Sequence, residues 1–220
     1  MSAGASEPAV VASAASAISP APRRTLYSDI KHDVLRAAWE RMPDFEGDPS
    51  AWEMFTSFLR LTTLVVVAYR LNRAVQRLRI PVVKQLLAIP VTIFDRTIAM
   101  MTGVTIMPSA DIGPGLLIHT PYAINIGGTR IGENCTVASG VTIAAGSLGI
   151  GDNVYFGAGA KLIGDAKIGN NVVIVANSLV LTDVKDNLTV VGVPARIKLR
   201  GGRPQRFRRV ATGGDSSAKK

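Results

Sequence analysis

The chain has 220 residues, 47% of them hydrophobic and 19% charged, which is the composition of a soluble globular protein with one or two domains. Its single cysteine, Cys135, excludes a disulfide framework and indicates a reducing compartment, so we expect a cytoplasmic protein. Residues 196–220 hold nine basic residues against one acidic residue, Asp215. The net charge of +9 therefore belongs mainly to the tail, which argues against a basic nucleic-acid-binding face elsewhere.

Residues 1–22 are rich in Ala, Ser and Pro and cannot bury enough apolar surface to fold alone. We expect a disordered leader here. The apolar run VVASAASAI lacks the basic start and the length of a signal peptide, and a cleaved leader is the remaining alternative.

Residues 23–103 are predicted to form a helical N-terminal region. The apolar spacing over 28–42 is typical of an amphipathic helix, with Asp29 and Asp33 early in it, where the helix dipole favours them. Ser50, followed three residues later by Glu53, is a capping box, and it predicts the start of a long helix that runs to about Arg79.

Prolines are expected to punctuate this helical region. Pro81 is expected to end the long helix, because proline lacks a backbone N–H and clashes with the preceding turn. A further helical run covers 82–101, and Pro90 is expected to interrupt it.

The apolar stretch LTTLVVVAY at 61–69 has nine residues, whereas a membrane span needs about twenty, so we expect a helix buried against a partner. Four cations share roughly one helical face: Arg70, Arg73, Arg77 and Lys84. This face is either solvated, or attracted to acidic lipid headgroups, or attracted to the phosphates of a bound ligand. Peripheral membrane contact therefore stays open.

An aliphatic residue recurs every six positions between 106 and 184. The phase slips by one residue only between Ile124 and Ile131 and between Ile143 and Ile150. The thirteen units open at Ile106, Ile112, Ile118, Ile124, Ile131, Val137, Ile143, Ile150, Phe156, Leu162, Ile168, Ile174 and Val180.

This six-residue period predicts a β-helix at 104–198. Three units close one coil, the first and fifth positions point inward, and thirteen units give roughly four coils. Cys135 then falls at an inward position and is interpreted as a core residue. A β-sandwich or barrel would instead show period-two runs separated by hairpin signals, which this stretch lacks. Residues 199–220 are expected to form a basic flexible tail, and no nucleic-acid partner is expected.

The hexads, followed by VVGVPARI (190–197), resemble the left-handed β-helix acyltransferases of the hexapeptide-repeat family. The helical stretch AYRLNRAVQRLRIP (68–81) lies where serine O-acetyltransferases of this family place their last N-terminal helices. The segments that look like their catalytic domain are IMPSADIGPGLLIHTPYAINIGG (106–128), TRIGENCTVASGVTI (129–143), GIGDNVYFGAGAKLIGDAKIG (149–169) and VVGVPARI.

The resemblance implies a mainly β chain: a left-handed parallel β-helix of hexapeptide repeats preceded by an α-helical segment. It implies transfer of an acetyl group from acetyl-CoA to a hydroxyl of a small acceptor, serine or a sugar-like compound, at active sites between the subunits of a homotrimer. The alternative is a catalytically degenerate β-helix trimer that acts as a binding or scaffold protein. No metal is expected, because zinc-dependent, carbonic-anhydrase-like chemistry needs several histidines and the prism holds only His119.

The resemblance also implies which positions bind the coenzyme, largely through backbone groups in the groove between subunits. Arg196 and Lys198 are the cations best placed in the sequence to meet its phosphates. Each glycine or alanine could equally be a corner or core position. The matching positions are Gly157, Ala158, Gly159, Ala160, Ala176, Asn177, Gly192, Val193, Pro194, Ala195, Arg196 and Lys198.

For catalysis, the resemblance implies a histidine general base that removes the acceptor hydroxyl proton while a carboxylate orients its ring. Aligned without gaps from Gly113 to Gly127, the family's Asp–His pair falls on His119 and Thr120. The family's upstream Asp falls on Thr105. The candidate base, His119, is therefore one place early and lacks its carboxylate neighbour.

Two interpretations of His119 stay open, because a shift of one residue in an extended segment turns a side chain to the other face. Either the backbone differs at HTPY, through a bulge that Pro121 would favour, or His119 has a structural or vestigial role. If His119 acts as the base, its orienting partner is expected to be Asp111 or a backbone carbonyl. The later loop, which carries a second histidine in the family, is reduced to AAGSLG (144–149), and His32 is expected on a helix surface.

Overall fold

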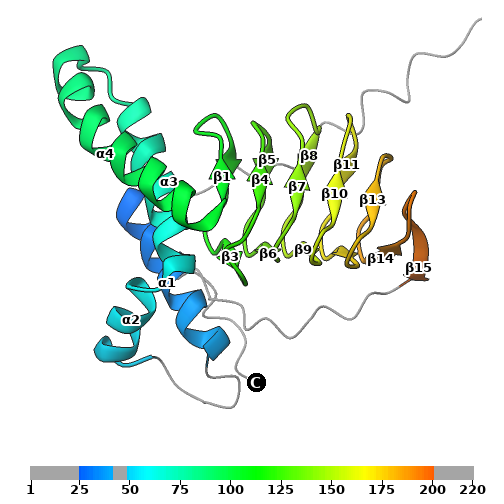
Figure 1. Ribbon diagram of the computed structural model, residues 1–220. Coiled ribbons are helices and arrows are strands. Elements are labelled where there is room, and N and C mark those ends of the chain that lie inside the picture. The colour runs from blue at the N-terminus through cyan, green and yellow to red at the C-terminus, as the bar shows by residue number, and fades with distance from the viewer. Residues whose placement is uncertain (1–24, 42–48, 201–220) are drawn as a thin grey trace, which may run out of the picture.

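The computed structural model describes residues 25–41 and 49–200 and places four helices at one end of a long β-prism (Figure 1). The leader predicted at 1–22 and residues 201–220 of the predicted tail lie outside the described residues. The helices are α1 (Leu26–Arg41), α2 (Ala51–Phe58), α3 (Leu61–Gln76) and α4 (Pro81–Thr102).

The single long helix predicted from Ser50 onward is wrong, because the chain forms two helices, α2 and α3, with a bend of 76° between them. Arg60 is extended (φ −69°, ψ 140°), and α3 begins after it in a new direction. The capping box itself is confirmed. The Ser50 hydroxyl accepts a hydrogen bond from the Glu53 backbone N–H (3.3 Å), and the Glu53 carboxylate accepts one from the Ser50 N–H (2.7 Å).

The predicted interruption at Pro90 is also wrong, since α4 is continuous through it. Proline leaves the carbonyl of Leu86 without its helical donor, and both residues are exposed, so water can satisfy that carbonyl. Pro81 is at the start of α4, where no intrahelical donor is needed, and Gly103 ends the helix in the left-handed region at φ 66°.

Within the described residues, no single helix has the length and apolar character to cross a membrane. Only α2 and α3 taken together reach that length and apolarity, across their 76° bend. The apolar stretch 61–69 is instead buried as predicted, with Val65, Val66 and Tyr69 packed into the core that the prism shares with α3.

Three sheets form the faces of the prism, and successive coils add one strand to each. Sheet A contains β1 (Thr105–Ile106), β4 (Asn125–Ile126), β7 (Thr142–Ile143), β10 (Lys161–Leu162) and β13 (Leu179–Val180). Sheet B contains β2 (Asp111–Ile112), β5 (Arg130–Ile131), β8 (Gly149–Ile150) and β11 (Lys167–Ile168). Sheet C contains β3 (Leu117–Ile118), β6 (Thr136–Val137), β9 (Tyr155–Phe156), β12 (Val173–Ile174), β14 (Leu188–Val191) and β15 (Arg196–Arg200).

The predicted left-handed parallel β-helix is confirmed. All paired strands in the described residues are parallel except β14 and β15, which pair antiparallel at the C-terminal end. Where the repeat is regular, each coil takes eighteen residues, as the pairing of Lys161 with Leu179 shows.

The interior of the prism is filled by the aliphatic residues that open the units, of which Ile112, Ile143 and Leu162 are among the most deeply buried. Cys135 is fully buried at an inward position, which confirms it as a core residue. Burial raises the pKa of the Cys135 thiol to about 12.

The predicted phase is wrong in the fourth unit. Ile126 pairs with Ile106 and with Ile143, so Ile126 opens this unit, and Ile124 takes the inward position just before it. Both isoleucines are buried, so burial does not show which of them opens the unit, and the strand register decides it. The step from Ile118 to Ile126 is eight residues (126 − 118) instead of six, so the corner between β3 and β4 is two residues longer than a regular unit.

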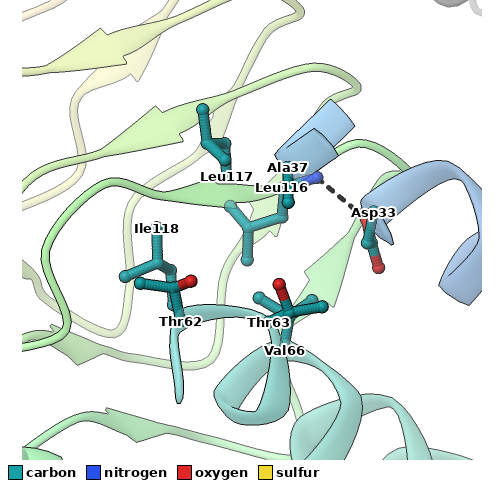
Figure 2. A pocket seen from close by; sticks show the side chains of 8 residues that line it. All are labelled: Asp33, Ala37, Thr62, Thr63, Val66, Leu116, Leu117 and Ile118. Atoms are coloured by element: carbon teal, nitrogen blue, oxygen red, sulfur yellow. Dashed lines mark hydrogen bonds between the residues drawn. The ribbon is translucent and has the colours of Figure 1, made fainter. Parts of the chain in front are cut away.

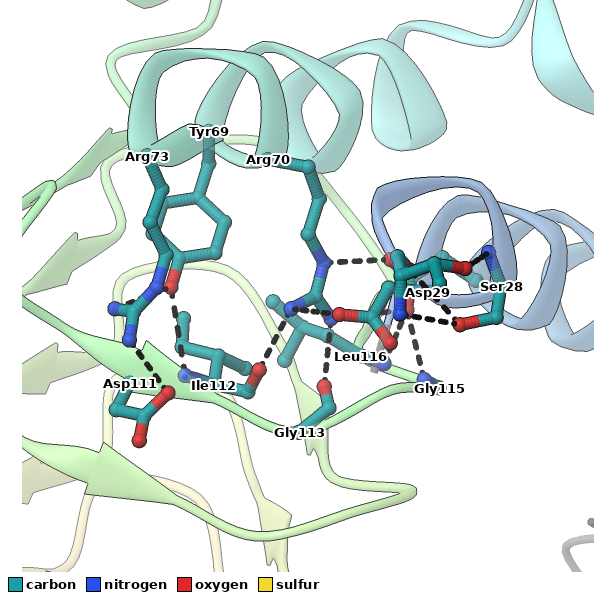
Figure 3. Close-up of polar contacts among 12 residues, drawn as sticks. Ser28, Asp29, Tyr69, Arg70, Arg73, Asp111, Ile112, Gly113, Gly115 and Leu116 are labelled. Atoms are coloured by element: carbon teal, nitrogen blue, oxygen red, sulfur yellow. Dashed lines mark hydrogen bonds and ion pairs between the residues drawn. The ribbon is translucent and has the colours of Figure 1, made fainter. Parts of the chain in front are cut away.

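Buried polar contacts join the helices to the first coil (Figure 3). Arg70 was predicted on a solvated or ligand-facing surface, but its side chain is only 4% exposed. It donates hydrogen bonds to the carbonyls of Ile112 and Gly113, at 2.6 Å each, and pairs with Asp33 at 3.0 Å. Burial lowers the pKa of Arg70, but the neighbouring Asp33 carboxylate raises this pKa above its usual value. The cation is therefore a structural clamp.

Candidate active site

The candidate site begins at the long corner between β3 and β4, which contains residues 119–123. Ala123 has a left-handed backbone (φ 51°), and the Tyr122 N–H donates to the Thr120 carbonyl at 3.0 Å. The Tyr122 carbonyl in turn accepts a hydrogen bond from the Gly140 N–H of the next coil at 2.8 Å. The backbone at HTPY therefore departs from the regular hexad, as one of the two interpretations of His119 requires.

His119 lies on the outer side of this corner, with 60% of its side chain exposed. Its Nε2 is 3.8 Å from Oε1 of Glu40, and its Nδ1 is 3.2 Å from the hydroxyl of Thr120. The imidazole is thus flanked by a carboxylate on one side and a hydroxyl on the other. Glu40 was missed by sequence reasoning, because it belongs to α1 and nothing in its local sequence indicates a contact with the prism.

The partner expected to orient His119 was either Asp111 or a backbone carbonyl. Asp111 instead forms an ion pair with Arg73 at 2.6 Å (Figure 3). It also lies 3.9 Å from Arg77. The expectation for Asp111 is therefore wrong. Its charge is used to hold α3 on the first coil, and the carboxylate next to His119 comes from α1.

Two buried residues hold α1 against the prism and so position Glu40. Asp33 accepts hydrogen bonds from the N–H groups of Gly115 and Leu116, at 2.7 and 3.0 Å. Arg36, one helical turn before Glu40, donates to carbonyls of the first two coils and, at 2.7 Å, to the Thr136 hydroxyl. Residues four apart share a helix face, so the turn that carries Arg36 also places Glu40 beside the prism.

Next to this junction, α1, α3 and β3 leave a small gap lined by Asp33, Thr63, Val66 and Leu116 (Figure 2). It has room for no more than about one water molecule. The gap is a packing defect at the junction of helices and prism, and the candidate substrate site is the exposed corner outside it.

The corners that follow the strands of sheet C are stacked in one line, and His119 is at the first of them. The Gly159 N–H donates to the Ser139 carbonyl, and the Asn177 N–H donates to the Ala158 carbonyl, each at 2.8 Å. This line, which we call the C-edge, contains residues 119–123, 138–140, 157–159, 175–177 and 192–194. The predicted coenzyme positions in 157–159, 176–177 and 192–194 therefore lie along one edge with the candidate base.

Several of these positions also have a structural reason for their residue type. A Cβ on Gly157 would lie 2.5 Å from the backbone nitrogen of Ala176, so the coils can stack only with glycine there. Gly159 has φ +71°, in the left-handed region that favours glycine. Ala160 is fully buried inside the prism, so only its backbone is near the C-edge.

At the C-terminal end, Val193 and Pro194 are exposed, and the Ala195 N–H donates to the Leu179 carbonyl at 2.7 Å. Arg196 and Lys198 follow on β15, and both are exposed. The C-edge thus has a histidine at its N-terminal end, small residues along its middle and two cations near its C-terminal end. In the described part of the chain, no group of three or more His, Cys, Asp or Glu residues could hold a metal ion.

Comparison with known proteins agrees with this architecture. A family model described as bacterial transferase hexapeptide (six repeats) matches residues 149–182, which form the coils between β8 and β13. The chain is 35% identical over 167 residues to a serine acetyltransferase of Synechococcus elongatus, covering 72% of this chain and 66% of that protein. It is 37% identical over 171 residues to a serine acetyltransferase of Staphylococcus xylosus, covering 72% of this chain and 74% of that protein.

Solved structures give the same result. The crystal structure of Neisseria gonorrhoeae serine acetyltransferase in complex with serine superposes with a TM-score of 0.62 at 27% identity, covering 79% of this chain and 69% of that one. A serine acetyltransferase in complex with CoA superposes with a TM-score of 0.61 at 25% identity and the same coverage. The fold is that of a hexapeptide-repeat transferase. More narrowly, the chain belongs to the serine acetyltransferase family. It spans about two thirds of the length of its Synechococcus relative.

Proposed function

We propose that the protein transfers an acetyl group from acetyl-CoA to a hydroxyl of a small acceptor, serine or a sugar-like compound. Membership of the serine acetyltransferase family supports the reaction type, and the relatives with bound CoA and bound serine support the two substrates. The observation that carries the proposal is the alignment of His119 with the predicted coenzyme positions on one edge of the prism.

The dimensions of the C-edge suit an extended coenzyme. Neighbouring strands lie about 4.8 Å apart, so the four steps from the corner of His119 to that of Gly192 span about 19 Å. Arg196 and Lys198 would pair with the phosphates beyond that end, and the thioester would lie near His119. The small residues between them leave backbone groups accessible to the pantetheine arm.

His119 is proposed as the general base. If Nε2–H donates a hydrogen bond to Glu40, the proton of the neutral imidazole stays on Nε2, and the lone pair of Nδ1 is left to accept the proton of the acceptor hydroxyl. Thr120 occupies that position in the structure and would give way to the acceptor. The separation of 3.8 Å from Glu40 exceeds a hydrogen bond, and such contacts often shorten when substrate binds.

In the reaction, the acceptor oxygen attacks the thioester carbonyl as its proton moves to Nδ1 of His119. The tetrahedral intermediate then collapses, the C–S bond breaks, and the thiolate of CoA takes the proton from the imidazolium. One ester forms and one thioester is lost, and the enzyme returns to its starting state. No metal or redox partner is needed for this balance.

A homotrimer in the cytoplasm completes the proposal. Each C-edge is an open surface with an exposed histidine, and a coenzyme bound there gains a second wall only from a neighbouring prism. Three prisms around a three-fold axis would provide three such grooves.

Turnover with a panel of acceptors tests the proposal. The full chain is mixed with acetyl-CoA and L-serine, other hydroxy amino acids or sugars, and the free thiol of CoA is measured over time. Acceptor-dependent thiol release supports the proposal. Absence of both turnover and CoA binding would favour a scaffold protein. This is the specific alternative because Thr120 stands where the family has its histidine.

A further inference from the structure

Helix α4 carries a row of exposed aliphatic side chains on the face turned away from the rest of the protein. Val82, Leu86, Ile89, Ile93 and Met100 are spaced so that, at 100° per residue, they fall within about 60° of arc. All five are exposed, Val82 to 76% and Leu86 to 72%. We call these five residues the α4 stripe.

The opposite face of α4 is the one that packs on the protein. Ile98 is buried, Phe94 packs against the core, and Asp95 accepts a hydrogen bond from Asn72 of α3 at 3.3 Å. The α4 stripe is therefore not a mispositioned core face. Its side chains are exposed, and α4 itself lies at the helical end of the prism (Figure 1).

The exposed apolar surface is wider than the seam of a coiled coil. Val83 and Met101 are exposed as well, to 40% and 69%, and they extend the apolar arc to about 120°, where Phe94 begins the face that packs on the core. A coiled-coil contact needs only a narrow stripe at two positions of each heptad. A broad apolar face suits a fluid apolar phase better than a single helix of a partner.

The charges around the α4 stripe are almost all positive. Residues 77–102 contain four cations and one acidic residue, Asp95, which faces α3. Arg77 lies near Asp111 of the first coil, and Lys84 is on the opposite side of α4. Arg79 and Arg96 are therefore the cations next to the stripe. Two copies joined symmetrically through this face would bring the same cations together without acidic partners. A bilayer with anionic lipids would accept the apolar stripe and pair with its cationic rim.

We propose that the α4 stripe docks the protein on the surface of an anionic lipid bilayer. The helix lies in the plane of the membrane, with the stripe among the acyl chains and Arg79 and Arg96 at the headgroups. The contact is peripheral, since α4 keeps its packing on α3. It would hold the prism beside the membrane, with the C-edge free to meet its substrates.

Vesicle flotation tests this with the full chain. Wild-type protein is expected to float with vesicles of phosphatidylcholine mixed with phosphatidylglycerol, and to float less with phosphatidylcholine alone or at high salt. The double variant Leu86→Glu/Ile89→Glu is expected to lose about tenfold or more of the bound fraction, because it places two charges in the apolar face. The matched control Leu148→Glu changes a leucine that is 69% exposed on the prism and should bind like wild type.

Three results would overturn the proposal. Wild-type protein that fails to float with anionic vesicles has no such surface. Flotation that survives the double variant assigns binding to another region of the chain. The third result concerns particle size, measured by light scattering without lipid. If the double variant gives a folded circular dichroism spectrum but forms a smaller particle than wild type, the stripe is a contact between copies of the chain.

Discussion

Glu40 of α1 and His119 of the corner after β3 face each other at 3.8 Å, although they belong to different structural layers of the protein. The helix supplies the carboxylate, and the prism supplies the imidazole. The buried contacts of Asp33 and Arg36 keep the two layers in register. In the proposed mechanism this pair replaces a carboxylate adjacent to the histidine in the sequence.

Substitution of Glu40 tests this pairing. Glu40→Gln should lower kcat by about tenfold, because the amide no longer stabilises the imidazolium. This is a part of the roughly 10²- to 10⁴-fold that a positioned base contributes. The KM for acetyl-CoA should stay unchanged, since Glu40 is not on the C-edge. Glu40→Asp keeps the charge and should recover some of the lost kcat. If kcat is the same in all three proteins, Glu40 has no role in orienting His119.

The coenzyme end of the C-edge is tested by charge removal. Arg196→Ala should raise the KM for acetyl-CoA by about tenfold, the value of one charge-assisted hydrogen bond, and leave kcat nearly unchanged. Arg130→Ala removes an equally exposed cation from sheet B and should leave both constants close to wild type. Equal effects of the two substitutions would indicate general electrostatic attraction in place of a phosphate contact at Arg196.

The clamp between α3 and α1 makes a prediction about stability. Arg70→Met would leave the carboxylate of Asp33 buried without its ion partner, which costs about 3–5 kcal/mol in the free energy of unfolding. Lys31→Met, on the exposed side of α1, should change that free energy by less than about 0.5 kcal/mol. Urea unfolding monitored by circular dichroism measures both. An Arg70 variant as stable as the Lys31 variant would contradict the buried pairing.

Cys135 provides a probe of the prism interior. Burial raises the pKa of its thiol to about 12, so the thiolate that attacks a disulfide reagent is scarce at pH 8, and the sulfur is also inaccessible. Folded protein should not react with Ellman's reagent, whereas protein unfolded in urea should release one equivalent of coloured thiolate per chain. Rapid labelling of the folded protein would mean that the coil containing Cys135 opens.

The repetitive region of the fold could be predicted because each hexad repeats one local rule. Ile112, Ile131 and Ile150 are five to seven residues from their neighbours in the repeat, and each is buried at the same place in its coil. The rule fails at Ile124 and Ile126, which are both aliphatic and only two residues apart. Which of the two isoleucines opens the unit depends on the hydrogen bonds that their strands make to other coils, and the six-residue period does not encode those bonds.

The helical region was predicted less well, because its details depend on contact with the prism. The bend at Arg60 follows the docking of α3, and no glycine or proline marks it. Arg70 has the spacing of a solvated cation, and the carbonyls of the first coil together with the carboxylates of Asp33 and Asp29 make its burial tolerable. The contact of Glu40 with His119 has the same origin, so sequence could name the candidate base but not its partner.

Turnover and CoA binding, measured together on wild-type protein and His119→Ala, test whether His119 is the general base of a CoA-dependent acetyl transfer. The variant should bind CoA as tightly as wild type by calorimetry, since no coenzyme position is changed, while acceptor-dependent thiol release falls by about 10²-fold or more. Unchanged thiol release in His119→Ala, or wild-type protein that neither binds CoA nor turns over, would contradict the account.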